Sequence, residues 1–182
     1  MTAHDAPPGY RIKAGDTDDA DALAALWVEL ADGQRRHGSH LRAAPNHDRI
    51  REAMLQHAVT DTVLVARKQV TSEGASGDEE TAGNVVGFIT FGRESEGYTQ
   101  DLARGIVHNV YVREDDRGVG VGAALLSAAE RALDERGVDA VALQAMAANG
   151  AARRFYRRNG YEAHRVELEK PLESDNLTTD DE

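Results

Sequence analysis

The sequence RGVGVGAALL, at residues 117–126, decides how this chain is expected to fold. Its alternating glycines stand between an apolar run at 106–112 and an amphipathic pattern that extends to about residue 136. This order predicts a strand, a glycine-rich turn and the first turn of a helix. Backbone N–H groups at a helix start have no intrahelical partner, and the helix dipole favours negative charge there. We therefore expect the turn to bind a phosphate or pyrophosphate group.

Two common phosphate-binding patterns fit these glycines poorly. A P-loop requires Lys and then Ser or Thr after its last glycine, whereas Ala123 and Ala124 stand there. A dinucleotide-binding fingerprint matches in bare spacing, but the polar segment 113–116 separates the strand from the glycines. The next predicted strand, at 138–143, is followed by Gln144 and not by the acidic residue that would bind a ribose.

A third pattern, Arg/Gln-x-x-Gly-x-Gly/Ala after a strand, is matched at every specified position from Arg117 to Gly122. This stretch resembles the acetyl-CoA motif of the GNAT N-acetyltransferase superfamily. A second signature of that family follows in the expected order: Asn149, then the pair Phe155-Tyr156 in a predicted helix, then Gly160 and Tyr161. The resemblance covers about residues 106–161.

The resemblance implies an α/β fold, a single-domain GNAT fold with a mixed central β-sheet flanked by helices on both faces. It also implies an N-acetyltransferase that moves the acetyl group of acetyl-CoA, its co-substrate, to a primary amine by direct attack. A non-catalytic acyl-CoA-binding or regulatory module on the same fold is the alternative. We expect a flexible N-terminus at 1–9, the domain at 10–172 with a mobile hairpin loop at 71–83, and a disordered acidic tail at 173–182.

The periodicity gives the order of the elements. We expect helices at about 16–33, 46–58 and 150–158, besides the one after the glycines, and an irregular segment at 34–45. Strands are expected at 10–14, 62–70, 84–91 and 106–112. The nearly continuous apolar run at 138–143 predicts a strand buried on both faces, and 161–168 carries the final strand.

The resemblance assigns residues to the co-substrate. Backbone groups of one strand would bind the pantetheine arm, with an N–H near Val110 or Val112 as the oxyanion donor, and the glycine turn would bind the pyrophosphate. The second signature would complete the site. The expected acetyl-CoA-binding residues are Val110, Tyr111, Val112, Arg117, Gly118, Val119, Gly120, Val121, Gly122, Ala123, Asn149, Ala152, Arg153 and Tyr156.

Acetyl transfer also needs an acid for the leaving thiolate and a neutral amine. Tyr156 is our candidate acid, because its ordinary pKa near 10 keeps it protonated at neutral pH. His108 and Glu94 are candidate bases, with Glu96 as a neighbouring carboxylate and a water relay as the alternative. No metal is expected, since the flexible spacing of His37 and its neighbours does not favour a metal site.

Composition limits the partners. The 182 residues carry a formal charge of −11, with 32 acidic and 21 basic side chains, which argues against nucleic acid. Only Lys13, Lys68 and Lys170 are lysines, so the acid excess predicts a halophilic protein, or else a GC-rich genome that favours Arg. With no Cys, signal peptide or membrane span evident, we expect a cytoplasmic protein acting on a small-molecule or protein amine, with a homodimer possible.

Overall fold

The computed structural model describes residues 5–69, 83–94 and 101–172. Five strands form one sheet in sequence order, antiparallel except for the parallel pair β4 and β5. The strands are β1 (Tyr10–Ala14), β2 (Val63–Lys68), β3 (Asn84–Arg93), β4 (Arg104–Val112) and β5 (Ala140–Leu143). The expected mixed sheet is therefore confirmed.

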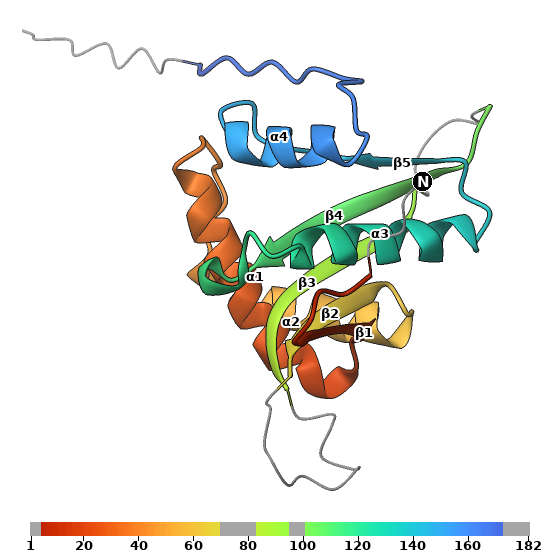
Figure 1. Ribbon diagram of the computed structural model, residues 1–182. Coiled ribbons are helices and arrows are strands. Elements are labelled where there is room, and N and C mark those ends of the chain that lie inside the picture. Colours follow the sequence, from red (N-terminus) through yellow and green to blue (C-terminus); the bar gives the residue numbers. More distant parts are fainter. Residues whose placement is uncertain (1–4, 70–82, 95–100, 173–182) are drawn as a thin grey trace, which may run out of the picture.

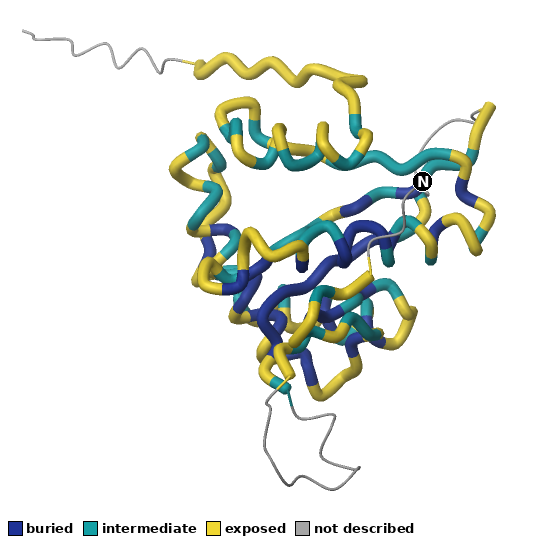
Figure 2. Tube along the Cα trace, viewed as in Figure 1, coloured by how far each residue is buried: buried dark blue, intermediate teal, exposed yellow. Residues whose placement is uncertain are grey.

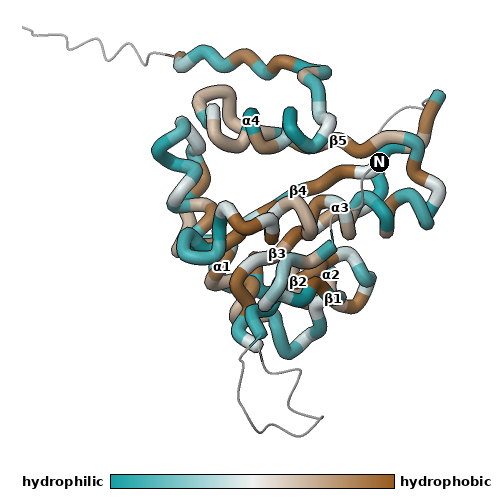
Figure 3. Tube along the Cα trace, in the orientation of Figure 1, coloured by the Kyte–Doolittle hydropathy of each residue, from teal (hydrophilic) through white to brown (hydrophobic). Residues whose placement is uncertain are grey.

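Helices cover both faces of this sheet (Figure 1). The helices α1 (Ala20–Arg35) and α2 (His47–Val59) pack on one face, where Trp27 and Phe88 belong to the same buried cluster. On the other face α3 (Val121–Asp134) buries Leu125 against Ile89 and Phe91. Figure 3 shows the apolar colour concentrated on the inner strands and on α3. The shorter α4 (Gly150–Arg158) follows β5.

Local sequence sets the ends of these helices. Asp16 and Asp19 form a reciprocal capping box in the 3-10 turn that leads into α1. The expected end of α1 at Gly33 is wrong, because the helix continues to Arg35. After α3, Gly137 adopts a φ of +71° and its N–H donates to Asp134, while the next residue donates to Leu133. This is the Schellman arrangement that glycine favours.

Two expectations at the far end of the sheet are wrong. The strand β5 is half-buried along its whole length and not buried on both faces. Residues 161–168 form no strand, and Val166 and Leu168 expose 81% and 90% of their surface. The two findings have one cause: within the described residues no strand pairs with the outer edge of β5, so neither segment is covered (Figure 2).

Several expectations fall on parts of the chain without a structural description. The loop expected at 71–83 lies almost entirely in 70–82, and the acidic tail at 173–182 lies beyond the last described residue. In the part of the chain that the structure does describe, no helix combines the length and apolarity that crossing a membrane requires.

Candidate functional site

The glycine turn has the backbone form that its sequence predicted. Gly118 and Gly120 adopt φ angles of +80° and +104°, which L side chains rarely take. Gly120 precedes the first turn of α3 and accepts the N–H of Ala124 through its carbonyl oxygen. The N–H groups of residues 121–123 come before any possible intrahelical acceptor, so they are available to a ligand. A Cβ added at Gly118 or Gly120 would meet no heavy atom within 4 Å, so the space beside the turn is open.

Asp116 holds this turn against the rest of the sheet, a role that no local sequence pattern predicts. It is only 4% exposed, and one carboxylate oxygen accepts hydrogen bonds from the Tyr10 hydroxyl at 2.8 Å and the Lys68 ammonium at 2.7 Å. Burial alone would raise the pKa of Asp116, but these two donors outweigh it and lower the pKa. An ionised carboxylate therefore ties the residues before Arg117 to β1 and β2.

The strands β4 and β5 separate halfway along β4. Their last paired residues are Val107 and Leu143, whereas β4 continues to Val112. Among the described residues the β5-facing edge of residues 108–112 is thus left without a strand partner. This is the segment expected to bind the pantetheine arm. His108 lies at the point of separation. It is the extra residue of a β-bulge, because Thr90 pairs with Asn109 and the adjacent Phe91 pairs with Val107.

The short helix α4 stands next to the glycine turn. A Cβ on Gly122 would lie 3.5 Å from the ring of Phe155, so α4 packs close to the first turn of α3. Asn149 caps α4, because its side-chain amide oxygen accepts the N–H of Ala152 at 3.0 Å. Among the described residues, the two N–H donors of the same amide have no hydrogen-bond partner. Tyr156 lies edge-on to Phe155 and Tyr161, and burial raises its pKa.

Other expected site residues have different surroundings. The Arg117 side chain folds back to the carbonyl oxygen of Val112 at 2.7 Å and lies over the Tyr111 ring. Glu94 forms an ion pair with Arg104 at 3.2 Å, at the opposite end of β4 from Val112. The structure therefore does not bring Glu94 to the point where β4 and β5 separate. Arg153 donates to the carbonyl oxygen of Ala147, and Glu96 lies outside the described residues.

A second histidine, His57, joins His108 at the bulge. It comes from the last turns of α2, and its ring centroid lies 6.2 Å from that of His108. Burial, and then the charge of His108, lower the pKa of His57, and burial lowers the pKa of His108. Sequence reasoning missed His57, because 50 residues of other elements intervene and no local pattern links the two. Across the described ranges no three His, Cys, Asp or Glu side chains converge as a metal site would require.

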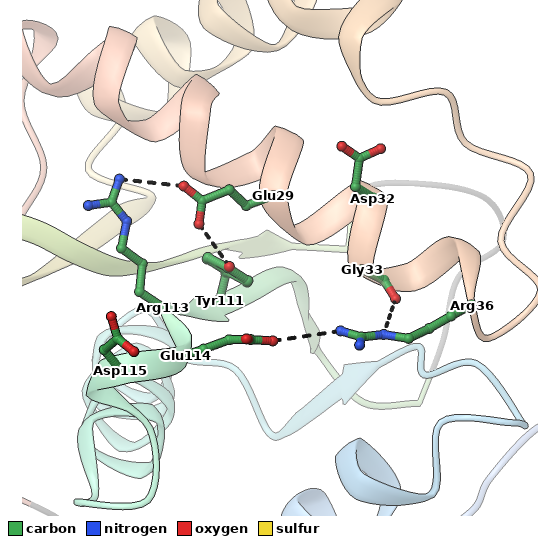
Figure 4. Close-up of a pocket in the computed structure, with 8 residues that line it drawn as sticks. All are labelled: Glu29, Asp32, Gly33, Arg36, Tyr111, Arg113, Glu114 and Asp115. Atoms are coloured by element: carbon green, nitrogen blue, oxygen red, sulfur yellow. Dashed lines mark hydrogen bonds and ion pairs between the residues drawn. The ribbon is translucent and has the colours of Figure 1, made fainter.

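An open pocket of about 750 Å³ lies between α1 and the residues that follow β4 (Figure 4). Tyr111 donates to Glu29 at 2.9 Å across the pocket, and Glu29 also contacts Arg113 at 3.5 Å. Carboxylates outnumber cations here. The charged lining residues are Glu29, Asp32, Glu114 and Asp115 against Arg36 and Arg113. The pocket thus favours a positively charged ligand.

The fold and this site define a class of protein: an α/β domain with a glycine turn at a helix start, beside a strand edge that pairs with no other described strand. The model of the family described as "Acetyltransferase (GNAT) domain" matches residues 60–163. The chain belongs to this family, whose members use acetyl-CoA as co-substrate.

Two curated relatives are also named as acetyltransferases. Two proteins described as L-methionine sulfoximine/L-methionine sulfone acetyltransferase, from Pseudomonas paraeruginosa and Pseudomonas aeruginosa, are each 36% identical over 86 residues. The match covers 46% of this chain and 47% of each relative, so the chain spans about half the length of the curated relatives it matches.

Solved structures match over more of the chain. A Bacillus halodurans protein has a TM-score of 0.69 at 17% identity and covers 89% of this chain and 99% of its own. A GCN5-related N-acetyltransferase from Ralstonia eutropha has a TM-score of 0.63 at 22% identity and covers 90% and 99%. At these identities the likeness establishes the fold, which agrees with the expected GNAT arrangement.

Proposed function

We propose that this protein transfers the acetyl group of acetyl-CoA to a primary amine of a small molecule by direct attack. The observation that carries the proposal is the glycine turn at the start of α3, which follows the part of β4 that continues beyond its pairing with β5. The turn would bind the pyrophosphate, and the unpaired edge of β4 at 110–112 would bind the pantetheine arm. An arm laid along this edge from the turn leads to His108, about 13 Å from Val112 at 3.3 Å per residue.

The chemistry of transfer then falls to residues around the bulge. A backbone N–H near Val110 would stabilise the tetrahedral oxyanion. His108 is the proposed base, because its lowered pKa leaves the imidazole neutral at pH 7. The hydroxyl of Tyr156 would hydrogen-bond the departing thiolate. Because burial raises the pKa of Tyr156 further above that of a thiol, full proton transfer to sulfur is uphill and the hydrogen bond is its main contribution.

The names of the curated relatives favour a small molecule with a free amino group as the acceptor, because they describe acetylation of L-methionine sulfoximine and L-methionine sulfone. A protein amine remains the second acceptor class. The sequence contains no Cys, so a thioester-linked acetyl-enzyme has no nucleophile.

Calorimetric titration with acetyl-CoA, and with NAD as the control, tests the co-substrate. Thiol release in the presence of methionine sulfoximine, methionine sulfone, a polyamine, an aminoglycoside and a lysine peptide then tests the acceptor. We expect acetyl-CoA alone to bind and at least one amine to release CoA, with mass spectrometry showing the acetylated amine. Tight acetyl-CoA binding with no release by any amine would favour the acyl-CoA-binding module instead, and no binding would refute the assignment of the glycine turn.

A further inference from the structure

The hydrogen bonds behind His57 are satisfied together by only one of its two neutral tautomers. Nδ1 of His57 lies 2.7 Å from the Thr62 hydroxyl, which lies 2.8 Å from the Thr60 hydroxyl. The Thr60 hydroxyl in turn lies 2.8 Å from the carbonyl oxygen of Gln56, which can only accept. Each hydroxyl has one proton. All three contacts are satisfied only if Thr60 donates to Gln56, Thr62 to Thr60, and His57 Nδ1–H to Thr62.

This direction leaves Nε2 of neutral His57 as an unprotonated acceptor. The two rings are tilted by 47° with centroids 6.2 Å apart, and no hydrogen bond between them is found among the described residues. A separation of this size suits one bridging water. His108, the residue at the bulge, is the more exposed of the two. It lies on β4, the strand proposed to bind the pantetheine arm, so in the proposed site His108 would meet the substrate first and His57 would lie behind it.

We propose that His57 and His108 form a two-histidine proton relay that removes the proton of the acceptor amine. The relay rests on the proposed acetyl transfer. The acceptor is an ammonium ion at neutral pH, and one of its N–H bonds breaks as the proton passes to one nitrogen of His108, which frees the lone pair to attack the thioester carbon. A second N–H bond breaks as the C–S bond of the tetrahedral intermediate breaks, and this proton ends on the departing thiolate. The other nitrogen of His108 releases a proton through water to Nε2 of His57, which passes it to solvent. His108 returns to its neutral form without holding a charge beside the departing thiolate.

The charged groups around His57 agree with this role. The turn after α2 carries Asp61, whose carbonyl oxygen accepts a hydrogen bond from Arg136 at 2.7 Å. From β3, Arg93 donates to the Arg136 carbonyl oxygen. From β4, His108 is the group whose charge acts on His57. Within the described residues no carboxylate forms an ion pair with either imidazole, so no fixed negative charge holds either ring in its protonated form.

His57→Asn separates the relay from a structural role. The Asn amide can still donate to Thr62 in place of Nδ1–H but has no basic nitrogen. We expect kcat to fall about tenfold or more, with the KM for acetyl-CoA and the thermal midpoint unchanged. His47→Asn is the matched control on the same helix, since His47 contacts only the adjacent Asp48 among its described ion pairs. In His57→Ala, added imidazole should restore part of the rate.

The outcomes are distinct. A His57→Asn enzyme with the wild-type rate and pH profile would overturn the relay and leave only the hydrogen bond to Thr62. Nitrogen NMR of the wild-type protein without substrate gives an independent reading: an Nε2–H tautomer of His57 would also overturn it. If the wild-type protein acetylates none of the amines, the proposed function itself falls, whereas an active wild type beside a fully active variant refutes the relay alone.

Discussion

Replacing Gly120 with Ala tests the glycine turn directly, and Gly137→Ala is its matched control. Both glycines have positive φ, +104° and +71°, and an added Cβ at either would meet no heavy atom within 4 Å. The cost is therefore backbone strain alone. We expect roughly 1–2 kcal/mol of lost stability for Gly137→Ala. At Gly120 the φ lies further from the left-handed helical region, so we expect about 1–3 kcal/mol.

The two variants should differ in ligand binding. Relaxing the φ of Gly120 would turn the N–H groups of Val121 and Gly122 away from a common direction. Losing one hydrogen bond to a charged phosphate costs about 1.5–3 kcal/mol, or a roughly 10- to 150-fold higher Kd. Gly137 lies at the other end of α3, so its variant should bind acetyl-CoA as the wild type does.

Urea unfolding and calorimetric titration with acetyl-CoA measure the two effects separately. A lower urea midpoint with an unchanged m-value would report the strain in both variants. Only Gly120→Ala should also weaken binding. If it loses stability yet binds acetyl-CoA as tightly as Gly137→Ala, the turn does not hold the pyrophosphate and our reasoning is refuted.

Three further predictions concern other parts of the site. Asp116→Asn should lower the free energy of unfolding by about 1–3 kcal/mol and weaken acetyl-CoA binding, since the amide carries no negative charge to pair with the Lys68 ammonium. Asp115→Asn, at an exposed neighbour, should do neither, and equal effects in urea and calorimetry would contradict the anchoring role. Tyr156→Phe should lower kcat with little change in acetyl-CoA affinity; steady-state kinetics that show an unaltered kcat would remove the tyrosine from the reaction. Because the pKa values of His57 and His108 are lowered in the folded protein, the unfolded state binds protons first as the pH falls. Their contribution to stability is therefore full above the ordinary pKa of 6.5 and is lost as the pH falls through the folded values. Thermal midpoints measured from pH 7.5 to 4.5 should fall less steeply when both histidines are replaced by Asn, and parallel curves for wild type and variant would contradict this.

The local sequence was enough to predict those parts of the site that are formed by a few consecutive residues. The alternation of Gly118 and Gly120 with larger residues specifies positive φ at a helix start, and no distant contact is needed to produce it. The capping box of Asp16 and the glycine end of α3 are local in the same way. The order of strands and helices followed from hydrophobic periodicity, because each element buries one face whatever its neighbours are.

Tertiary structure decided what depends on neighbours far apart in the sequence. The apolar run at 138–143 could not show that β5 lies at a sheet edge, since periodicity records apolar residues and not strand pairing. The same holds for 161–168, where a strand-like pattern finds no partner strand among the described residues. His57 meets His108 only because a bulge in β4 and the end of α2 come together. Burial, hydrogen-bond direction and charge at a site depend on residues that are distant in the sequence and come together only in the folded protein. Local sequence patterns therefore do not predict them.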